Sequence, residues 1–393
     1  MSHSIRHFTR AVETLLTSSG VDLPRRTRQR LLFFVLGILL SSSLVLRRIA
    51  CTHAYLTPQT TCAASHERRL RRVLNDPLLS WERSYARVLR RLLARQRPRQ
   101  WVIILDESGH TDRLRVLTAA LGYRGRAIPL AWVYWPGQTP QTTSYWTRCT
   151  SVLDLVAQVL PDGAAVVVVA DRAFGCPVFT DPVAARGWDW VVRVQGQTRW
   201  RDRHGRVQPL RQQVAVAGQR WKGRGELFKD AGWREASALA LWGRAHREPL
   251  LLASSLPVSW DLVALYKKRA AIAALFRDWK SSGWQWEASQ VTDLAHQERL
   301  LLGLAFATLL TLLLGSAAAT REQSCPPRGS QRRSWAGAHS LFRLGREAFW
   351  QRLWRNDRTS ICWELAELDG PNWSAESRSY HAPAGTTIGR RGA

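Results

Sequence analysis

The sequence contains no C-x-x-C pair and no cluster of histidines, although it has six cysteines and ten histidines. Zinc sites built from these residues need closely spaced ligand pairs, so a structural zinc site is excluded. The sequence also shows no secretory signal peptide and no internal repeat. We therefore expect a cytoplasmic protein whose cysteines are reduced thiols rather than disulfides.

Acidic residues are scarce, because 30 Asp and Glu stand against 57 Lys and Arg and give a formal net charge of +27. This excess is larger than solubility requires and indicates a polyanionic partner. Nucleic acid is the first expectation, since neutralising phosphates releases counterions. An anionic membrane surface is the alternative. Most of the 20 tryptophans are expected in the core, although Arg and Trp side chains can also stack on bases.

Long apolar runs are few, and two of them need an interpretation. The run at residues 31–46 is short for a membrane span, but the run at 300–319 carries no charge and is long enough to cross a bilayer. The second run is also rich in Gly, Ala and Thr, which suits close helix packing inside a domain. We favour a buried core helix without a membrane, because the flanking segments are typical of a cytosolic enzyme. A membrane protein with a span at 300–319 remains an alternative.

The composition changes along the chain and predicts three regions. Residues 1–97 place Arg, Leu and Ala at helical spacing, which predicts an N-terminal helical DNA-binding region. Residues 98–320 alternate predicted strands and helices, with a β-rich, glycine-punctuated insertion at about 195–248. Residues 321–393 are rich in Arg, Ser and Pro and predict a basic C-terminal region, with one helix at 341–353 and disorder beyond about 369. The predicted fold class is α/β.

Two acids each follow a short apolar run that predicts a buried strand. Asp106 follows residues 101–105, and Asp171 follows the β-branched run at 164–170. If these strands are parallel neighbours, their ends bring both carboxylates close enough to share Mg²⁺ or Mn²⁺. Two such ions could then support phosphodiester cleavage. The alternative is that each Asp only stabilises the turn after its strand. Further strands are predicted at 114–120, 127–134, 190–194 and 250–254, and helices at 152–160 and 177–186.

Residues 266–282 predict one amphipathic helix. At about 100° per residue, one stripe holds Tyr266, Arg269, Ala273, Arg277 and Lys280. The adjoining face is apolar and is expected to enter the core. A stripe of one phenol and several cations suits a polyanionic substrate. The apolar face consists of Ile272, Leu275, Phe276 and Trp279.

The order of these elements is the layout of an RNase H-like nuclease core. The local sequences Asp106-Glu-Ser-Gly-His-Thr-Asp and Val-Val-Val-Val-Ala-Asp171-Arg-Ala-Phe-Gly are similar to those of bacterial insertion-sequence transposases of the DDE type. One subgroup of that family carries the signature Y-x2-R-x3-E-x6-K. Here Tyr266, Arg269 and Lys280 match the signature at the right spacing. The resemblance covers residues 101–315.

The resemblance implies both an activity and roles for single residues. Asp106 and Asp171 would hold the catalytic Mg²⁺ or Mn²⁺ ions, and Tyr266, Arg269 and Lys280 would bind phosphates of the transposon end. The activity would be hydrolysis that releases a 3′-hydroxyl, followed by its transfer into target DNA. The implied partners are double-stranded DNA, at the transposon ends and the target, and a second copy in a homodimer. The implied location is the bacterial cytoplasm, in association with the nucleoid.

The sequence departs from the signature at its acid, because the glutamate position is Ala273. No nearby acid replaces it readily. Asp278 would point about 140° away on the same helix, and Glu287 lies beyond the expected helix end. Glu107 should face the opposite side of the sheet from Asp106, which leaves Asp112 as a further acid near the first strand. A catalytically inactive DNA-binding derivative of a transposase is therefore the second hypothesis.

Overall fold

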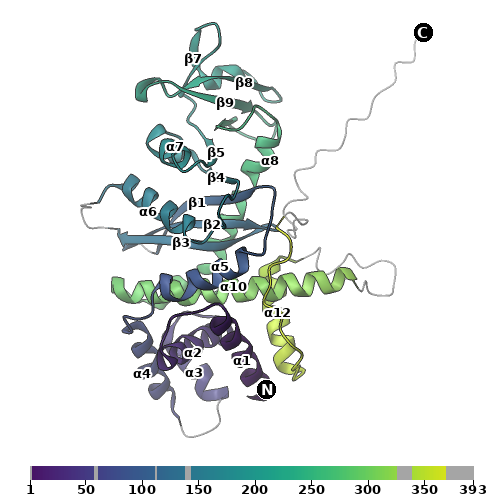
Figure 1. Cartoon of the computed structure of the whole chain (residues 1–393). Coiled ribbons are helices and arrows are strands. Elements are labelled where there is room, and N and C mark those ends of the chain that lie inside the picture. Colours follow the sequence, from purple (N-terminus) through teal and green to yellow (C-terminus); the bar gives the residue numbers. More distant parts are fainter. Residues whose placement is uncertain (1, 57–60, 111–112, 138–142, 325–338, 369–393) are drawn as a thin grey trace.

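The computed structural model describes residues 2–56, 61–110, 113–137, 143–324 and 339–368. Within these ranges the chain is a mixed α/β structure built on one large sheet (Figure 1). The predicted α/β class is confirmed. The prediction of disorder beyond residue 369 lies outside the described residues, as does Asp112.

The sheet has ten strands in the order β3-β2-β1-β4-β5-β10-β9-β8-β6-β7. The six strands predicted outside the insertion are all present, with bounds that differ from the predicted ones by a few residues. They are β1 (Trp101–His110), β2 (Leu114–Tyr123), β3 (Arg126–Pro136), β4 (Val166–Ala170), β5 (Asp189–Arg193) and β10 (Leu250–Ser254).

The strand β1 lies at the centre of the first half of the sheet. It pairs antiparallel with β2 and parallel with β4, and β4 pairs parallel with β5. Because the first five residues of β1 and the whole of β4 are buried on both faces, these stretches are continuous apolar runs rather than alternating ones. The strand β1 is longer than predicted, since its antiparallel pairing with β2 continues through Asp106 to His110.

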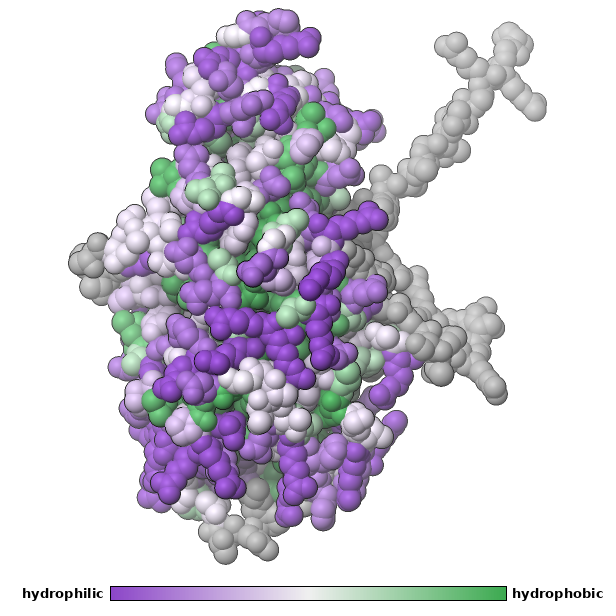
Figure 2. Space-filling model, in the orientation of Figure 1, coloured by the Kyte–Doolittle hydropathy of each residue, from purple (hydrophilic) through white to green (hydrophobic). Residues whose placement is uncertain are grey.

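The predicted β-rich insertion contains four strands. These are β6 (Arg199–Arg201), β7 (Val207–Pro209), β8 (Arg220–Leu227) and β9 (Arg234–Leu241). The strand β10 pairs with both β5 and β9, so the inserted strands extend the main sheet instead of forming a separate one. They lie at the top of Figure 1, and Figure 2 shows mainly hydrophilic residues on the visible face there.

Helices flank the sheet and fill the lower part of the molecule (Figure 1). The helices α6 (Tyr145–Ala157) and α7 (Pro177–Ala184) contact each other, and α6 packs on β2 and β3. Below the sheet lie α10 (Leu294–Ser324) and α12 (Leu341–Trp354), followed by the N-terminal helices. The N-terminal helices are α1 (Ser2–Ser18), α2 (Arg25–Ser41), α3 (Leu46–Leu56), α4 (Ala63–Leu74), the π-helical turn η1 (Trp81–Tyr85) and α5 (Ala86–Leu93).

Helix α10 contains the long apolar run that raised the question of a membrane span. It is long and apolar enough to cross a bilayer, and the bent pair α2 and α3 would count as a second span only if taken together. However, 94% of its apolar window is buried inside the protein, between β3 on one side and α2 and α4 on the other. Its Thr308 hydroxyl accepts hydrogen bonds from the indoles of Trp279 and Trp284, both at 3.1 Å. This burial is what a central core helix requires.

Small residues of α10 permit close contacts, as their composition predicted. A Cβ atom at Gly303 would collide with the ring of Phe34 on α2. A Cβ atom at Gly315 would collide with the carbonyl oxygen of Leu341 on α12. Glycine is therefore required at both positions if these helices are to approach as closely as they do.

Candidate active site

The two predicted catalytic aspartates lie side by side at the centre of the sheet. The parallel register between β1 and β4 ends with Leu105 opposite Ala170, so Asp106 and Asp171 are the next residues on the two strands. The expected adjacency is confirmed. Asp106 remains inside β1, opposite Thr118 of β2, whereas Asp171 begins the 3₁₀ turn η2 (Arg172–Phe174).

One guanidinium group links the two carboxylates. Nη2 of Arg269 donates to Oδ2 of Asp106 at 3.1 Å and to Oδ2 of Asp171 at 3.4 Å. The remaining carboxylate oxygens accept backbone N–H groups, from Glu107 at 3.0 Å and from Ala173 at 2.9 Å. Both hydrogen bonds come from the same nitrogen of Arg269, so the two accepting carboxylate oxygens must lie close to each other. We call Asp106, Asp171 and Arg269 the acid–arginine cluster.

The prediction of one helix over residues 266–282 is wrong. The segment forms α8 (Asp261–Lys267) and α9 (Ala270–Trp279), joined at Lys268 and Arg269. Both junction residues keep right-handed helical angles, but the N–H groups there bond three residues back instead of four. This tighter turn changes the angular phase between Tyr266 and Ala273. It also points the Arg269 side chain at the acids.

The apolar face predicted for this segment is confirmed, since Ile272, Leu275, Phe276 and Trp279 are all buried. Ala273 is exposed, belongs to α9 and lies four residues after Arg269, the residue that directly precedes this helix. Residues four apart are neighbours on a helix surface. Position 273 is therefore the next side-chain position on the face from which Arg269 reaches the acid pair.

The other nearby acids have different partners. Asp278 is buried and accepts from Arg126 at 3.2 Å, so it points away from the cluster as predicted. Glu287 lies 3.3 Å from the ammonium group of Lys280. Glu107 pairs with Arg115 at 3.3 Å. None of the three bonds to Arg269 in the part of the chain that the structure describes.

The three residues of the predicted phosphate stripe are not equivalent in the structure. Tyr266 lies close enough to Arg269 and the acids for their charges to act on it, although burial is the main cause of its raised pKa. Lys280 caps the end of α9, where the backbone leaves the helical conformation. Its ammonium group pairs with Glu287. The single stripe of Tyr266, Arg269 and Lys280 is therefore broken at both ends of α9.

Arg193 belongs near the cluster and was not singled out from the sequence. It follows Val192, which pairs with Ala170, so it lies on β5 at the level of Asp171. Its charge lowers the pKa of Tyr266, and its guanidinium pairs with Glu248 at 2.6 Å. The signal that could have identified it is a cation that interrupts the apolar strand predicted at 190–194.

Burial controls the protonation of Asp106. It raises the pKa of this carboxyl, the positive charge of Arg269 lowers it, and the negative charge of Asp171 raises it again. The net pKa is above the ordinary value. Because a raised carboxyl pKa favours the protonated form in the folded state, this group's contribution to stability is largest at low pH and falls as the pH rises through the folded pKa.

We expect Arg269→Gln to raise the pKa of Asp106 further, because the variant removes the cation that opposes burial. The midpoint can be followed by NMR of the Asp106 carboxyl carbon. Arg115→Gln is the matched control, since it removes a cation from the neighbouring Glu107. An unchanged midpoint in Arg269→Gln, or an equal change in both variants, would contradict the observed pairing.

The acid–arginine cluster does not fit a site for two metal ions. Carboxylate oxygens suit Mg²⁺, but the cation position between them is occupied by a guanidinium group. Position 273 supplies no oxygen. Within the described residues, no group of three His, Cys, Asp or Glu side chains is arranged to hold a metal.

Comparisons with known proteins identify one matching family. Residues 112–310, just over half of the 393 residues, match the family model described as "Transposase DDE domain". The matched range contains Asp171 and the α8–α9 segment and begins six residues after Asp106. Among solved structures, the chain is similar to a piggyBac transposase in a synaptic complex with hairpin DNA. That similarity has a TM-score of 0.41 and 11% identity, and covers 95% of this chain and 87% of the other. No curated protein matched.

Proposed function

Because this chain belongs to the transposase DDE domain family, we propose that it binds the ends of a mobile DNA element and acts in DNA transposition. The formal net charge of +27 supports a DNA partner, since neutralised phosphates release counterions on binding. The strand order around β1, with an acid at equivalent levels of β1 and β4, supports an RNase H-like core. The spacing of Tyr266, Arg269 and Lys280 supports the bacterial insertion-sequence subgroup.

The N-terminal helices are the proposed general DNA-binding surface. Helix α4 buries Leu70, Val73 and Leu74 and exposes Arg68, Arg71 and Arg72. Its apolar side is thus committed to the core. Arg71 pairs with Glu67 at 3.0 Å, so Arg68 and Arg72 are the cations that we propose contact a phosphate backbone. The alternative is that these arginines only solvate the surface.

The single observation that supports this part of the proposal is the position of Arg269. A guanidinium that bonds both aspartates offsets only one of their two negative charges but occupies the place between them, and Ala273 supplies no third acid. We therefore propose a chain that binds transposon ends but cuts them poorly by itself. It would still occupy the ends and thereby affect transposition.

An active transposase is the second candidate, and one observation favours it. Asp106 and Asp171 are brought together by strand register and not by their contact with Arg269. If Arg269 turned toward a DNA phosphate, both carboxylates would become available to a cation. A strand-cleavage assay separates the two candidates and is set out in the Discussion.

Binding to duplex DNA is expected to be strong, independent of divalent metal and steeply dependent on salt. Several phosphate contacts should weaken affinity by orders of magnitude between about 50 and 200 mM salt. Fluorescence anisotropy with a labelled duplex in EDTA measures this. Arg68→Gln and Arg72→Gln should each reduce the salt slope by about 1 if α4 contacts phosphates.

The control for this experiment is Arg203→Gln, which removes an exposed cation from the turn between β6 and β7. Equal slopes for all three variants would assign α4 to the solvated surface. An affinity that hardly changes with salt would contradict the electrostatic basis of the proposal.

A further inference from the structure

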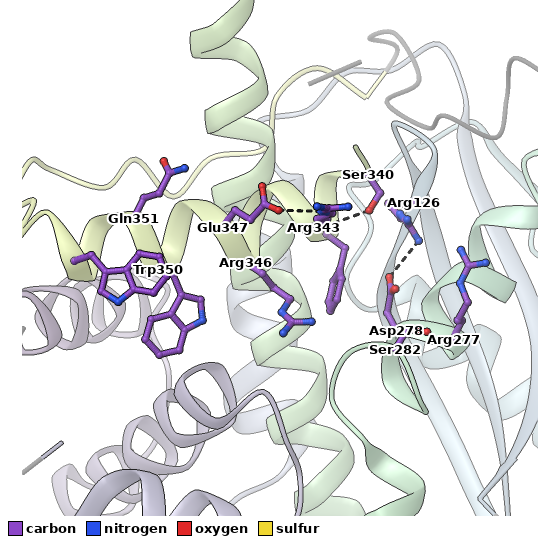
Figure 3. A pocket seen from close by; sticks show the side chains of 12 residues that line it. Arg126, Arg277, Asp278, Ser282, Ser340, Arg343, Arg346, Glu347, Trp350 and Gln351 are labelled. Atoms are coloured by element: carbon purple, nitrogen blue, oxygen red, sulfur yellow. Dashed lines mark hydrogen bonds and ion pairs between the residues drawn. The ribbon is translucent and has the colours of Figure 1, made fainter. Parts of the chain in front are cut away.

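A second basic site lies at the other end of α9 from Arg269. It is a pocket of about 550 Å³ between the end of α9, the start of β3 and one side of α12. Figure 3 shows these side chains around the opening, with those of α12 on one side and Arg126, Arg277 and Asp278 on the other. The volume is in the range of pockets that hold small organic groups.

The lining carries more positive than negative charge. Four arginines face two acids, and the acids already have partners: Asp278 pairs with Arg126 at 3.2 Å, and Glu347 pairs with Arg343 at 2.9 Å. By count, the lining side chains carry four positive and two negative charges. These arginines are Arg126, Arg277, Arg343 and Arg346.

Arg346 is a partly buried cation of the pocket with two contacts beyond its charge. It donates to the hydroxyl of Ser42 at 3.0 Å and lies over the ring of Trp284 at 5.9 Å. Burial lowers its pKa, so the charge is partly removed from water. A partly desolvated guanidinium gains when an anion approaches, and its planar fork suits phosphate oxygens. In addition, the buried Nε of Arg126 has no acceptor among the described residues.

The pocket also has an aromatic wall. Trp350 and Trp354 lie one turn apart on α12, with ring centroids 5.7 Å apart and planes inclined by 32°. Trp354 is 71% exposed, which is unusual for so large an apolar side chain. An exposed indole (Trp354) and a partly buried one (Trp350) beside guanidinium groups match the two parts of a nucleotide, which are an aromatic base and an anionic phosphate.

We propose that this pocket binds one unpaired nucleotide of a DNA strand, with the phosphate on the arginines and the base against Trp350 and Trp354. The proposal rests on the proposed function, because that function brings DNA to the molecule. Helix α9 joins the two sites. Arg277 lies eight residues after Arg269, a rise of about 12 Å along a helix. A strand near the acid–arginine cluster could therefore reach the pocket within a few nucleotides.

The pocket lies partly outside the segment that matches the family. Helix α12 supplies both indoles and two of the arginines, and it follows the end of the match at residue 310. The site thus depends on residues specific to the C-terminal part of this chain. It would let the protein distinguish an end with an unpaired nucleotide from a blunt duplex.

The experiment compares affinities of the full chain for two labelled DNAs in EDTA: a blunt duplex and the same duplex with a short unpaired extension. Arg277→Gln and Trp354→Ala change exposed residues and should leave folding intact. Each should weaken binding of the extended duplex by about tenfold, a modest value for the loss of one stacked base or one phosphate contact, and affect the blunt duplex far less. Arg355→Gln is the matched control, because it removes an exposed cation at the end of α12 that does not line the pocket.

Equal losses on both DNAs in Arg277→Gln and Trp354→Ala would overturn the proposal and place these residues in the general basic surface. Free deoxythymidine monophosphate at millimolar concentration forms a further arm. If it binds as tightly as the extended duplex, and if Arg277→Gln weakens both equally, the pocket is a site for free nucleotides. That result overturns the proposal that the pocket binds a nucleotide of a DNA strand. If all variants still bind the blunt duplex, the proposed DNA-binding function is unaffected by the fate of the pocket proposal. If the unaltered chain does not bind the blunt duplex, the proposed function itself is contradicted.

Discussion

Ala273→Glu is expected to raise Mg²⁺-dependent cleavage of DNA ends by at least about a hundredfold. Position 273 follows Arg269 by one helical turn, on the side of α9 that reaches Asp106 and Asp171. A third carboxylate there would both offer an oxygen to a cation and give Arg269 an alternative partner. The charge stabilisation that a metal supplies is worth several kcal/mol, and each 1.4 kcal/mol is about tenfold in rate.

The helix should accept this substitution. Ala273 is exposed, and Glu is a good helix former. The matched control is Ala273→Gln, which has nearly the same size and shape but no charge. Cleavage should increase only in the glutamate variant, measured as nicked product from a labelled duplex under single-turnover conditions. An equal increase with glutamine would show that bulk, and not a carboxylate, is what position 273 lacks.

Removing either aspartate from the Ala273→Glu protein is expected to return cleavage to background. Asp106→Asn and Asp171→Asn keep the size of the side chains, so the sheet should fold and duplex binding should persist. Glu107→Gln is the control, because Glu107 neighbours Asp106 but pairs with Arg115. It should retain most of the cleavage. Full cleavage by an asparagine variant would remove that aspartate from the site.

The sequence was sufficient for the strands and for the adjacency of the acids. Continuous apolar runs such as Val166–Ala170 are buried on both faces, and this pattern can be recognised without a structure. An acid directly after each of two such runs, on parallel neighbours, must then lie at one level of the sheet. Burial of the α9 face could be predicted for a related reason, because helical spacing decides which side chains share a face.

The sequence was not sufficient for the contact that decides the chemistry. Helical periodicity assumes one constant angle per residue, and the tight turn at Lys268 and Arg269 breaks that assumption. Lys280 was assigned to the same stripe, yet the backbone leaves the helix at this residue and its ammonium group pairs with Glu287. A long-range contact such as that between Arg269 and Asp106 depends on how α9 crosses the sheet, which no local pattern contains.

The pocket beside α12 was equally hidden from sequence reasoning. Its arginines come from β3, α9 and α12, which are separated by up to 220 residues along the chain from Arg126 to Arg346. In the sequence they are four among 57 basic residues. One local pattern points to the pocket: Trp350 and Trp354 lie four residues apart on α12. In the sequence, however, the neighbouring apolar residues of α12 make this pair look like part of a buried helix face.

The most direct measurement of the central claim is a nicking assay on the unaltered chain. A labelled duplex is incubated with the protein in Mg²⁺, and in a parallel series in Mn²⁺, at a salt concentration where binding is saturated. Since Arg269 occupies the place between Asp106 and Asp171 and Ala273 supplies no acid, we expect full binding and no more nicked product than Asp106→Asn gives. Efficient cleavage by the unaltered chain, lost in Asp106→Asn, would contradict this account and show that Arg269 leaves the acid pair when DNA binds.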